Sequence, residues 1–169
     1  MVGHLVPSFI KKEPKETSFY WGSCAWGDAS VIMPWTLYTH YGASYILETQ
    51  YPSMKGWIDW IVKNNLGPTG LWEHGFNFGD WLALDGDENQ EDDRYGGTDV
   101  MLVASAYLKY SSELVAKAAK VLGEAADADY YQKISDRTRR AIQEKYYTVD
   151  GKCMVQTQTA HILALAMNL

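Results

Sequence analysis

The chain has 169 residues, of which 47% are hydrophobic and 21% are charged. This composition excludes a disordered chain and fits a single domain, which we place at residues 1–169. A net charge of −6 without any basic stripe argues against nucleic acid as a partner. No apolar run reaches the ~20 residues that span a bilayer, and the first residues lack a signal-peptide pattern. We therefore expect a cytoplasmic protein without a membrane partner.

Five stretches show the apolar spacing of amphipathic helices, and no stretch alternates convincingly as a strand does. The first helix is predicted over residues 28–41, with Asp28 as its N-cap and Gly42 at its end. The second is predicted over 44–64, with a break expected at Pro52. The remaining three are predicted over 99–122 with Thr98 as the cap, 126–147, and 157–169. Short connections between long helices favour antiparallel hairpins, so the predicted class is all-α.

Residues 71–97 show no period and are rich in Trp, Gly and acidic side chains. An irregular connection of this length inside a compact domain is usually functional or disordered, and its first half is too aromatic for disorder. Glu73 and His74 are candidates to border a ligand pocket here. Asp80 is a candidate carboxylate for such a site, and its alternative role is a structural hydrogen bond to the loop.

Four segments of the chain, in this order, are similar to the motifs of a known protein family. They are CAWGDASVIMPWTLY from Cys24, LETQYPSMKGW from Leu47, FGDWLALD from Phe78 and QTQTAHILAL from Gln156. Together they resemble the bacterial α-L-rhamnosidases of glycoside hydrolase family 78, and the resemblance runs from about Gly3 to the last residue. It implies an (α/α)6 toroid, of which this chain would form roughly half. Half a toroid leaves apolar helix faces uncovered, so we expect a homo-oligomer.

The resemblance implies a site for a carbohydrate, a rhamnoside, and assigns roles within it. Asp28 matches an aspartate that binds the rhamnose hydroxyls, and Asp80 is the second carboxylate of the candidate catalytic set. Trp81 matches a Trp that walls the sugar pocket, while Trp26 lies one residue away from a family position where a Trp lines the site. The alternative roles are structural, with Asp28 as a helix cap and Trp26 as a core residue.

The chain departs from the family at the general acid. Glycoside hydrolysis needs two carboxyl groups that flank the bond, an acid and, in inverting enzymes such as this family, a base. Many members carry the acid seven residues before the aspartate matched by Asp28, where this chain has Trp21, or Gly22 if one gap is allowed. Glu13 and Glu16 are weak substitutes. The family's base would lie in a later helix, so we expect a fragment that is incomplete for catalysis alone.

Two other functions stay open at this point. One is a non-catalytic helical module that binds a sugar or a protein partner, which the lost acid favours. The other is a different (α/α)6 hydrolase of the trehalase or debranching type. The retained Asp28, Asp80 and Trp81 favour descent from a hydrolase. The four histidines show no metal-ligand spacing, so neither a metal nor another cofactor is predicted.

Overall fold

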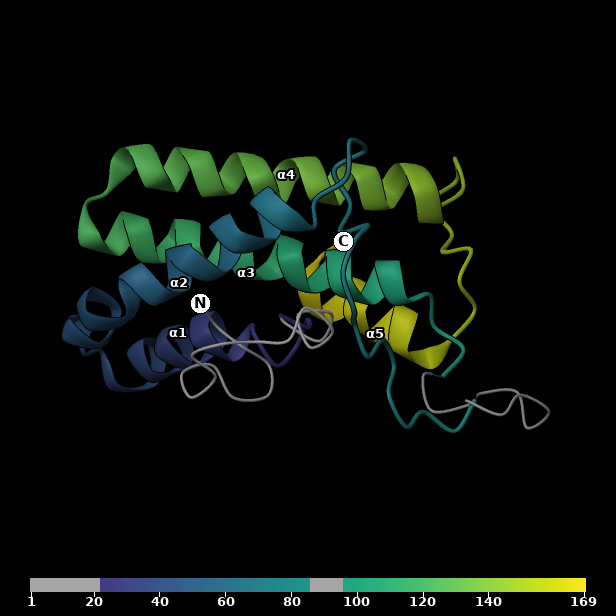
Figure 1. Ribbon diagram of the computed structural model, residues 1–169, viewed down its shortest axis with the longest axis horizontal. Coiled ribbons are helices and arrows are strands. Elements are labelled where there is room, and N and C mark those ends of the chain that lie inside the picture. Colours follow the sequence, from purple (N-terminus) through teal and green to yellow (C-terminus); the bar gives the residue numbers. More distant parts are fainter. Residues whose placement is uncertain (1–21, 86–95) are drawn as a thin grey trace, which may run out of the picture.

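The computed structural model describes residues 22–85 and 96–169, and within these ranges the chain forms five α-helices and two isolated β-bridges. The helices are α1 (Ala29–Tyr41), α2 (Ser44–Asn64), α3 (Val100–Leu122), α4 (Ala125–Tyr146) and α5 (Gln158–Met167) (Figure 1). The predicted all-α class is confirmed, and each helix end lies within two residues of its predicted place. None of these five helices is long and apolar enough to cross a membrane. Glu13, Glu16 and Trp21 lie outside the described residues.

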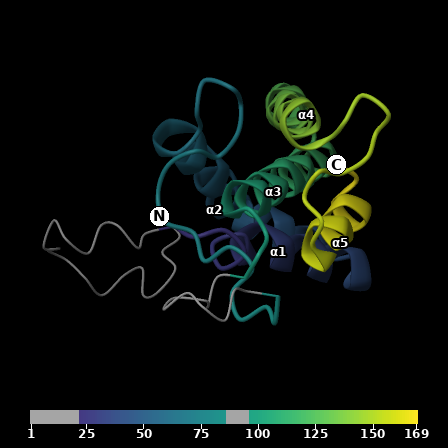
Figure 2. The ribbon, with the colours of Figure 1, turned by 90° about the vertical axis from the view of Figure 1, so that its right-hand side faces the viewer.

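Helix α3 is the central element and packs against each of the other four helices. In Figure 1, α4 lies along one side of α3, and α1 and α5 lie along the other; Figure 2 shows the same order from the end of the bundle. The reason is in the composition of α3, whose buried positions are mostly small. They include Ala104, Ser105, Ala106, Ser111, Ser112, Ala116, Ala118 and Ala119. A helix that is apolar and small on several sides can be surrounded closely by its neighbours.

Local residues set the helix ends. Gly42 ends α1 in a left-handed conformation, as predicted, and its N–H donates to the Tyr38 carbonyl. The predicted cap of α3 was wrong by one residue, because Asp99 accepts hydrogen bonds from the first-turn amides and Thr98 does not. Thr98 instead donates to Asp80, a contact across 18 residues of chain that no local pattern indicates.

The break predicted at Pro52 was wrong, since α2 continues through it. Pro52 is exposed, so its ring lies on the solvent side and the helix loses a single backbone hydrogen bond. On the opposite face Met54, Trp57 and Ile58 are completely buried. Tertiary packing of this face therefore outweighs the local penalty.

Candidate functional site

Four aromatic rings from two distant segments meet at the surface, and we call Trp26, Phe76, Phe78 and Trp81 the aromatic patch. The ring centroids of Trp26 and Trp81 are 5.6 Å apart, and Phe78 lies 4.9 Å from the first and 4.6 Å from the second. Phe76 meets Phe78 edge-on at 4.7 Å. Trp26 and Trp81 each keep 41% of their surface exposed. Both tryptophans singled out in the sequence thus lie side by side with ring surface open to solvent.

Hydrogen bonds fix the segment that carries Phe78 and Trp81 against the turn before α1. The Cys24 amide donates to Asn77 Oδ1 at 2.7 Å, and the Phe78 amide donates to Ser23 Oγ at 3.3 Å. Asn77 and Ser23 are both buried. These bonds hold Asn77 and Phe78 against the turn, although residues 73–85 form no helix or strand.

Asp80 ties the same segment to the beginnings of two helices. Its Oδ2 accepts from Thr98 Oγ1 at 2.8 Å, and the Thr98 and Thr157 hydroxyl oxygens are 2.7 Å apart. Thr98 precedes α3, and Thr157 caps α5 by accepting from the Ala160 amide. Asp80 is partly exposed and directly precedes Trp81 in the chain. It is the carboxylate that the loop places next to Trp81.

Backbone strain accompanies both exposed tryptophans. Among the described residues other than glycine, positive φ angles occur at Ala25 (66°), Leu82 (64°) and Asn168 (51°). Ala25 directly precedes Trp26, and Leu82 directly follows Trp81. Side chains with a Cβ seldom adopt this conformation, and where they do the strain often belongs to a functional site.

Asp28 lies two residues after Trp26 and is completely buried. Its Oδ1 accepts from Trp57 Nε1 at 2.8 Å and from Ser111 Oγ at 2.6 Å, while its Oδ2 accepts from the Ala25 amide at 2.8 Å. Burial raises the pKa of the Asp28 carboxyl, and these hydrogen bonds oppose the rise. Asp28 occupies the N-cap position of α1, but its side chain does not cap the helix.

Glycines allow a tryptophan cluster to approach the turn from below. The rings of Trp57 and Trp60 stack at 5.6 Å. A Cβ on Gly27 would lie 2.2 Å from the Trp57 ring, and one on Gly22 would lie 2.2 Å from the Trp60 ring. Position 22, one of the two places where the family's acid was sought, therefore has no room for a glutamate.

Glu73 and His74 lie at the turn that follows α2. Glu73 Oε1 accepts a hydrogen bond from Thr69 Oγ1, and the amides of Glu73 and His74 both donate to the Asn65 carbonyl. The carboxylate of Glu73 fills the space beside Gly67. These contacts place Glu73 at this turn rather than in the aromatic patch, and His74 is exposed next to it.

Sequence reasoning missed the two phenylalanines and Asn77 as parts of the site. The available signal was the dense run FNFGDW, in which aromatic residues alternate with small or polar ones. Within residues 22–85 and 96–169 no group of three or more His, Cys, Asp or Glu side chains is arranged to hold a metal ion.

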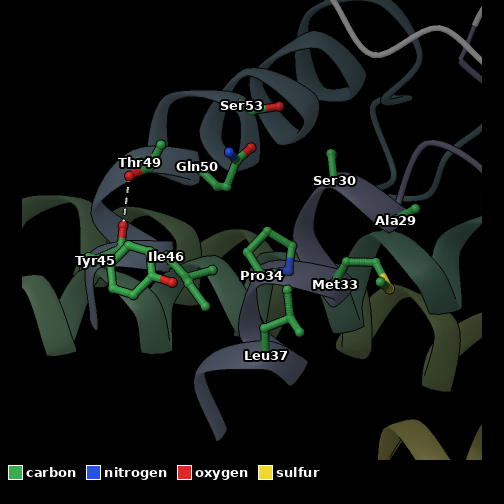
Figure 3. A pocket seen from close by; sticks show the side chains of 10 residues that line it. All are labelled: Ala29, Ser30, Met33, Pro34, Leu37, Tyr45, Ile46, Thr49, Gln50 and Ser53. Atoms are coloured by element: carbon green, nitrogen blue, oxygen red, sulfur yellow. Dashed lines mark hydrogen bonds between the residues drawn. The ribbon is translucent and has the colours of Figure 1, made fainter. Parts of the chain in front are cut away.

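A hollow lies between α1 and α2 and has a volume of about 370 Å³. Figure 3 shows Met33, Pro34 and Leu37 of α1 on one side and Tyr45 and Ile46 of α2 on another. Its lining is largely apolar and shares no residue with the aromatic patch. The hollow is a groove between two helices, and it lies apart from the aromatic patch.

The chain matches one family of proteins. Residues 2–169 match the model of the bacterial α-L-rhamnosidase six-hairpin glycosidase domain, so the chain belongs to that family. Family membership confirms the predicted class, all-α helical hairpins that form part of an (α/α)6 toroid. It also favours descent from a glycoside hydrolase over an unrelated helical module.

Two α-L-rhamnosidases are similar to most of this chain. The α-L-rhamnosidase of Streptomyces avermitilis is 36% identical over 148 residues, which cover 88% of this chain and 13% of that protein. The α-L-rhamnosidase of Alteromonas sp. is 36% identical over 157 residues, covering 88% and 16%. This chain therefore spans about one seventh of the length of these relatives.

Solved structures give the same result in three dimensions. The Streptomyces avermitilis α-L-rhamnosidase complexed with L-rhamnose superposes with a TM-score of 0.72 at 33% identity, covering 89% of this chain and 13% of that one. The α-L-rhamnosidase from Aspergillus terreus superposes with the same score of 0.72, also at 33% identity, covering 85% and 16%.

Proposed function

We propose that this chain contributes the sugar-binding wall of an α-L-rhamnoside hydrolase, and that the aromatic patch is this wall. The observation that carries the proposal is the pairing of two half-exposed tryptophans, Trp26 and Trp81, at 5.6 Å between segments 55 residues apart in the chain. Aromatic faces pack against the C–H groups of a sugar ring, and the methyl group of rhamnose adds apolar surface to that contact. Asp80 stands beside them as an acceptor for a sugar hydroxyl.

The described residues support binding better than turnover. Hydrolysis with inversion needs an acid on the leaving oxygen and a base on the opposite face, with the two carboxyl groups ~6.5–9.5 Å apart. Both oxygens of Asp28 already accept hydrogen bonds in the interior. Gly22, one of the two positions matched to the family's acid, has no side chain, and a Cβ there would overlap the Trp60 ring. We therefore assign no acid–base pair within residues 22–85 and 96–169, and we assign this chain the role of holding the sugar.

Direct binding tests the proposed wall. Ligand-observed NMR titration with L-rhamnose should show saturable binding by the chain. Replacing either tryptophan, by Trp26→Ala or Trp81→Ala, should weaken the affinity by about 3- to 10-fold, the effect of losing one aromatic face. The matched control is Tyr41→Ala, which removes a 76% exposed ring at the far end of α1 and should leave the affinity unchanged. Equal affinity in all three variants would refute the assignment.

Hydrolysis is the second test. The rate at which the chain alone cleaves an aryl α-L-rhamnoside should be about 10²–10⁴-fold lower than that of an intact family member. The reason is that at least one acid–base group is absent from the described site. The measurement is release of the chromophore under saturating substrate. Turnover near the common enzymatic scale of about 10 per second would contradict this expectation.

A second copy of the chain is the partner that we propose besides the sugar. Met33 and Leu37 of α1 and Ile162 and Leu165 of α5 are exposed apolar side chains on helices that lie along the same side of α3. Pairing of two copies over these helices would remove this apolar surface from water.

A further inference from the structure

The turn before α1 holds one residue in an unfavourable conformation. The Trp26 amide donates to the Cys24 carbonyl at 2.9 Å, which closes a hydrogen-bonded ring around Ala25. Ala25 has φ +66°, the sign found in the rare and strained form of the γ-turn. An alanine there costs free energy that a glycine would not, so other contacts must hold the conformation.

Asp28 supplies such a contact. Its Oδ2 accepts the amide hydrogen of Ala25 itself at 2.8 Å. Its Oδ1 is held from two other elements, by Trp57 Nε1 of α2 and Ser111 Oγ of α3. The carboxylate thus joins the strained turn to the buried faces of two helices, and a charged acceptor forms stronger hydrogen bonds than a neutral one.

We propose that Asp28 is a positioning residue, which holds Ala25 in its left-handed conformation and thereby sets Trp26 against Trp81. It acts through the turn, because its carboxylate is completely buried and bonded to Ala25, Trp57 and Ser111. The family resemblance implies instead a direct contact with the sugar hydroxyls. Trp26 is the residue directly after Ala25, so a change of φ at Ala25 redirects the indole. The link to sugar affinity rests on the proposed function, whereas the placement of Trp26 can be measured without any sugar.

The test is Asp28→Asn, which keeps the shape and loses one acceptor. An amide retains a single oxygen, so if that oxygen keeps Trp57 and Ser111, its nitrogen faces the Ala25 amide, a donor against a donor. The near-ultraviolet circular dichroism from the Trp26–Trp81 pair should fall to the level of a Trp26→Phe variant. L-rhamnose affinity should fall by about 3- to 10-fold, as for loss of the ring.

A control and a rescue separate positioning from general stability. Ser111→Ala removes one hydrogen bond to the same carboxylate but leaves the Ala25 contact, so the dichroism should persist even if the melting temperature falls. Adding Ala25→Gly to Asp28→Asn should restore the signal, because glycine adopts a φ of +66° without the Cβ penalty. An unchanged signal in Asp28→Asn, an equal loss in Ser111→Ala, or no recovery with Ala25→Gly would each overturn the proposal.

A measurement on the unaltered chain keeps the test decisive if Asp28→Asn fails to fold. Amide hydrogen exchange by NMR should show the Ala25 N–H protected by at least ~10²-fold relative to an unstructured peptide. Exchange at the unstructured rate would overturn the proposal. If the dichroism responds as expected but L-rhamnose does not bind the unaltered chain, the proposed function fails and the positioning role stands.

Discussion

Single residues decide how closely the interior approaches the candidate site. Gly27 is the clearest case, because three atoms of the Trp57 ring lie 2.2–2.6 Å from the place where its Cβ would be. That approach brings Trp57 Nε1 within 2.8 Å of Asp28. The absence of one side chain at position 27 is thus a condition for the hydrogen bond that anchors the turn.

Replacing Gly27 with alanine should destabilise the fold by about 1–3 kcal/mol, the usual cost of overpacking a rigid core. Urea unfolding followed by far-ultraviolet circular dichroism measures this change. Gly56→Ala is the matched control, since Gly56 is exposed in α2 with nothing within 4 Å of its Cβ position. That variant should gain about 0.5–1 kcal/mol from its better helix propensity. A Gly27→Ala chain as stable as the Gly56→Ala chain would contradict the packing argument.

Between elements, a buried lysine joins α5 to α3. Lys109 is only 3% exposed, and its Nζ donates to Glu113 Oε2 at 2.6 Å and to the Met167 carbonyl at 2.7 Å. Lys117 bonds the other oxygen of Glu113 at 2.6 Å. A cation at the last turn of α5 also suits the helix dipole. Lys109, paired with Glu113, therefore holds the end of α5 against α3.

The pKa of Glu113 gives this link a pH dependence. Partial burial alone would raise its pKa, but hydrogen bonds from Lys109 and Lys117 outweigh burial and lower it below the ordinary value of 4.5. A carboxyl whose folded pKa is depressed stabilises the fold above the unfolded pKa, and that contribution is lost as pH falls through the folded pKa. Glu113→Gln should therefore cost about 1–3 kcal/mol at pH 7 and show a weaker loss of stability below pH 4.5.

Thermal unfolding between pH 3 and pH 7, a range of about four units around these pKa values, measures the Glu113 effect. The control is Asp129→Asn, because Asp129 pairs with Lys133 at 2.5 Å in an exposed i,i+4 bridge. Exposed pairs contribute about 0–1 kcal/mol, so this variant should stay near the parent chain. Equal losses of stability in the two variants would show that the ion pair with the buried lysine contributes no more than an exposed one.

For the whole molecule, apolar surface remains on the side of α3 that carries α1 and α5. Leu165 is 86% exposed and Ile162 is 54% exposed on α5, while Met33 is 56% exposed on α1. The groove between α1 and α2 continues this apolar surface on α1. Uncovered apolar patches of this kind commonly mark an interface.

We expect self-association at micromolar concentration, measured by sedimentation velocity. The double variant Leu37→Glu with Leu165→Glu should shift the population to the monomer, because burial of unpaired charge opposes association. Val149→Glu is the control, since Val149 is fully exposed on the turn between α4 and α5. A monomer for the unaltered chain would refute the proposed partner.

Much of the fold follows from local chemistry alone. Apolar spacing identified the five helices, and Gly42 and Thr157 set two of their ends by backbone preference and side-chain capping. Trp26 and Trp81 were also named in the sequence as parts of one candidate site, and the two rings do lie together. Their contact with a sugar stays a prediction. These properties depend on neighbours within a few residues or on the residue type itself.

Only the tertiary structure decided where each carboxylate and aromatic ring lies. Asp28 reads in sequence as a cap or a sugar ligand, yet its partners Trp57 and Ser111 are 29 and 83 residues away, and together they bury it. Thr98 lost its expected capping role to a contact with Asp80 for the same reason. Burial and long-range hydrogen bonds depend on which helices pack together, and no local pattern encodes that choice.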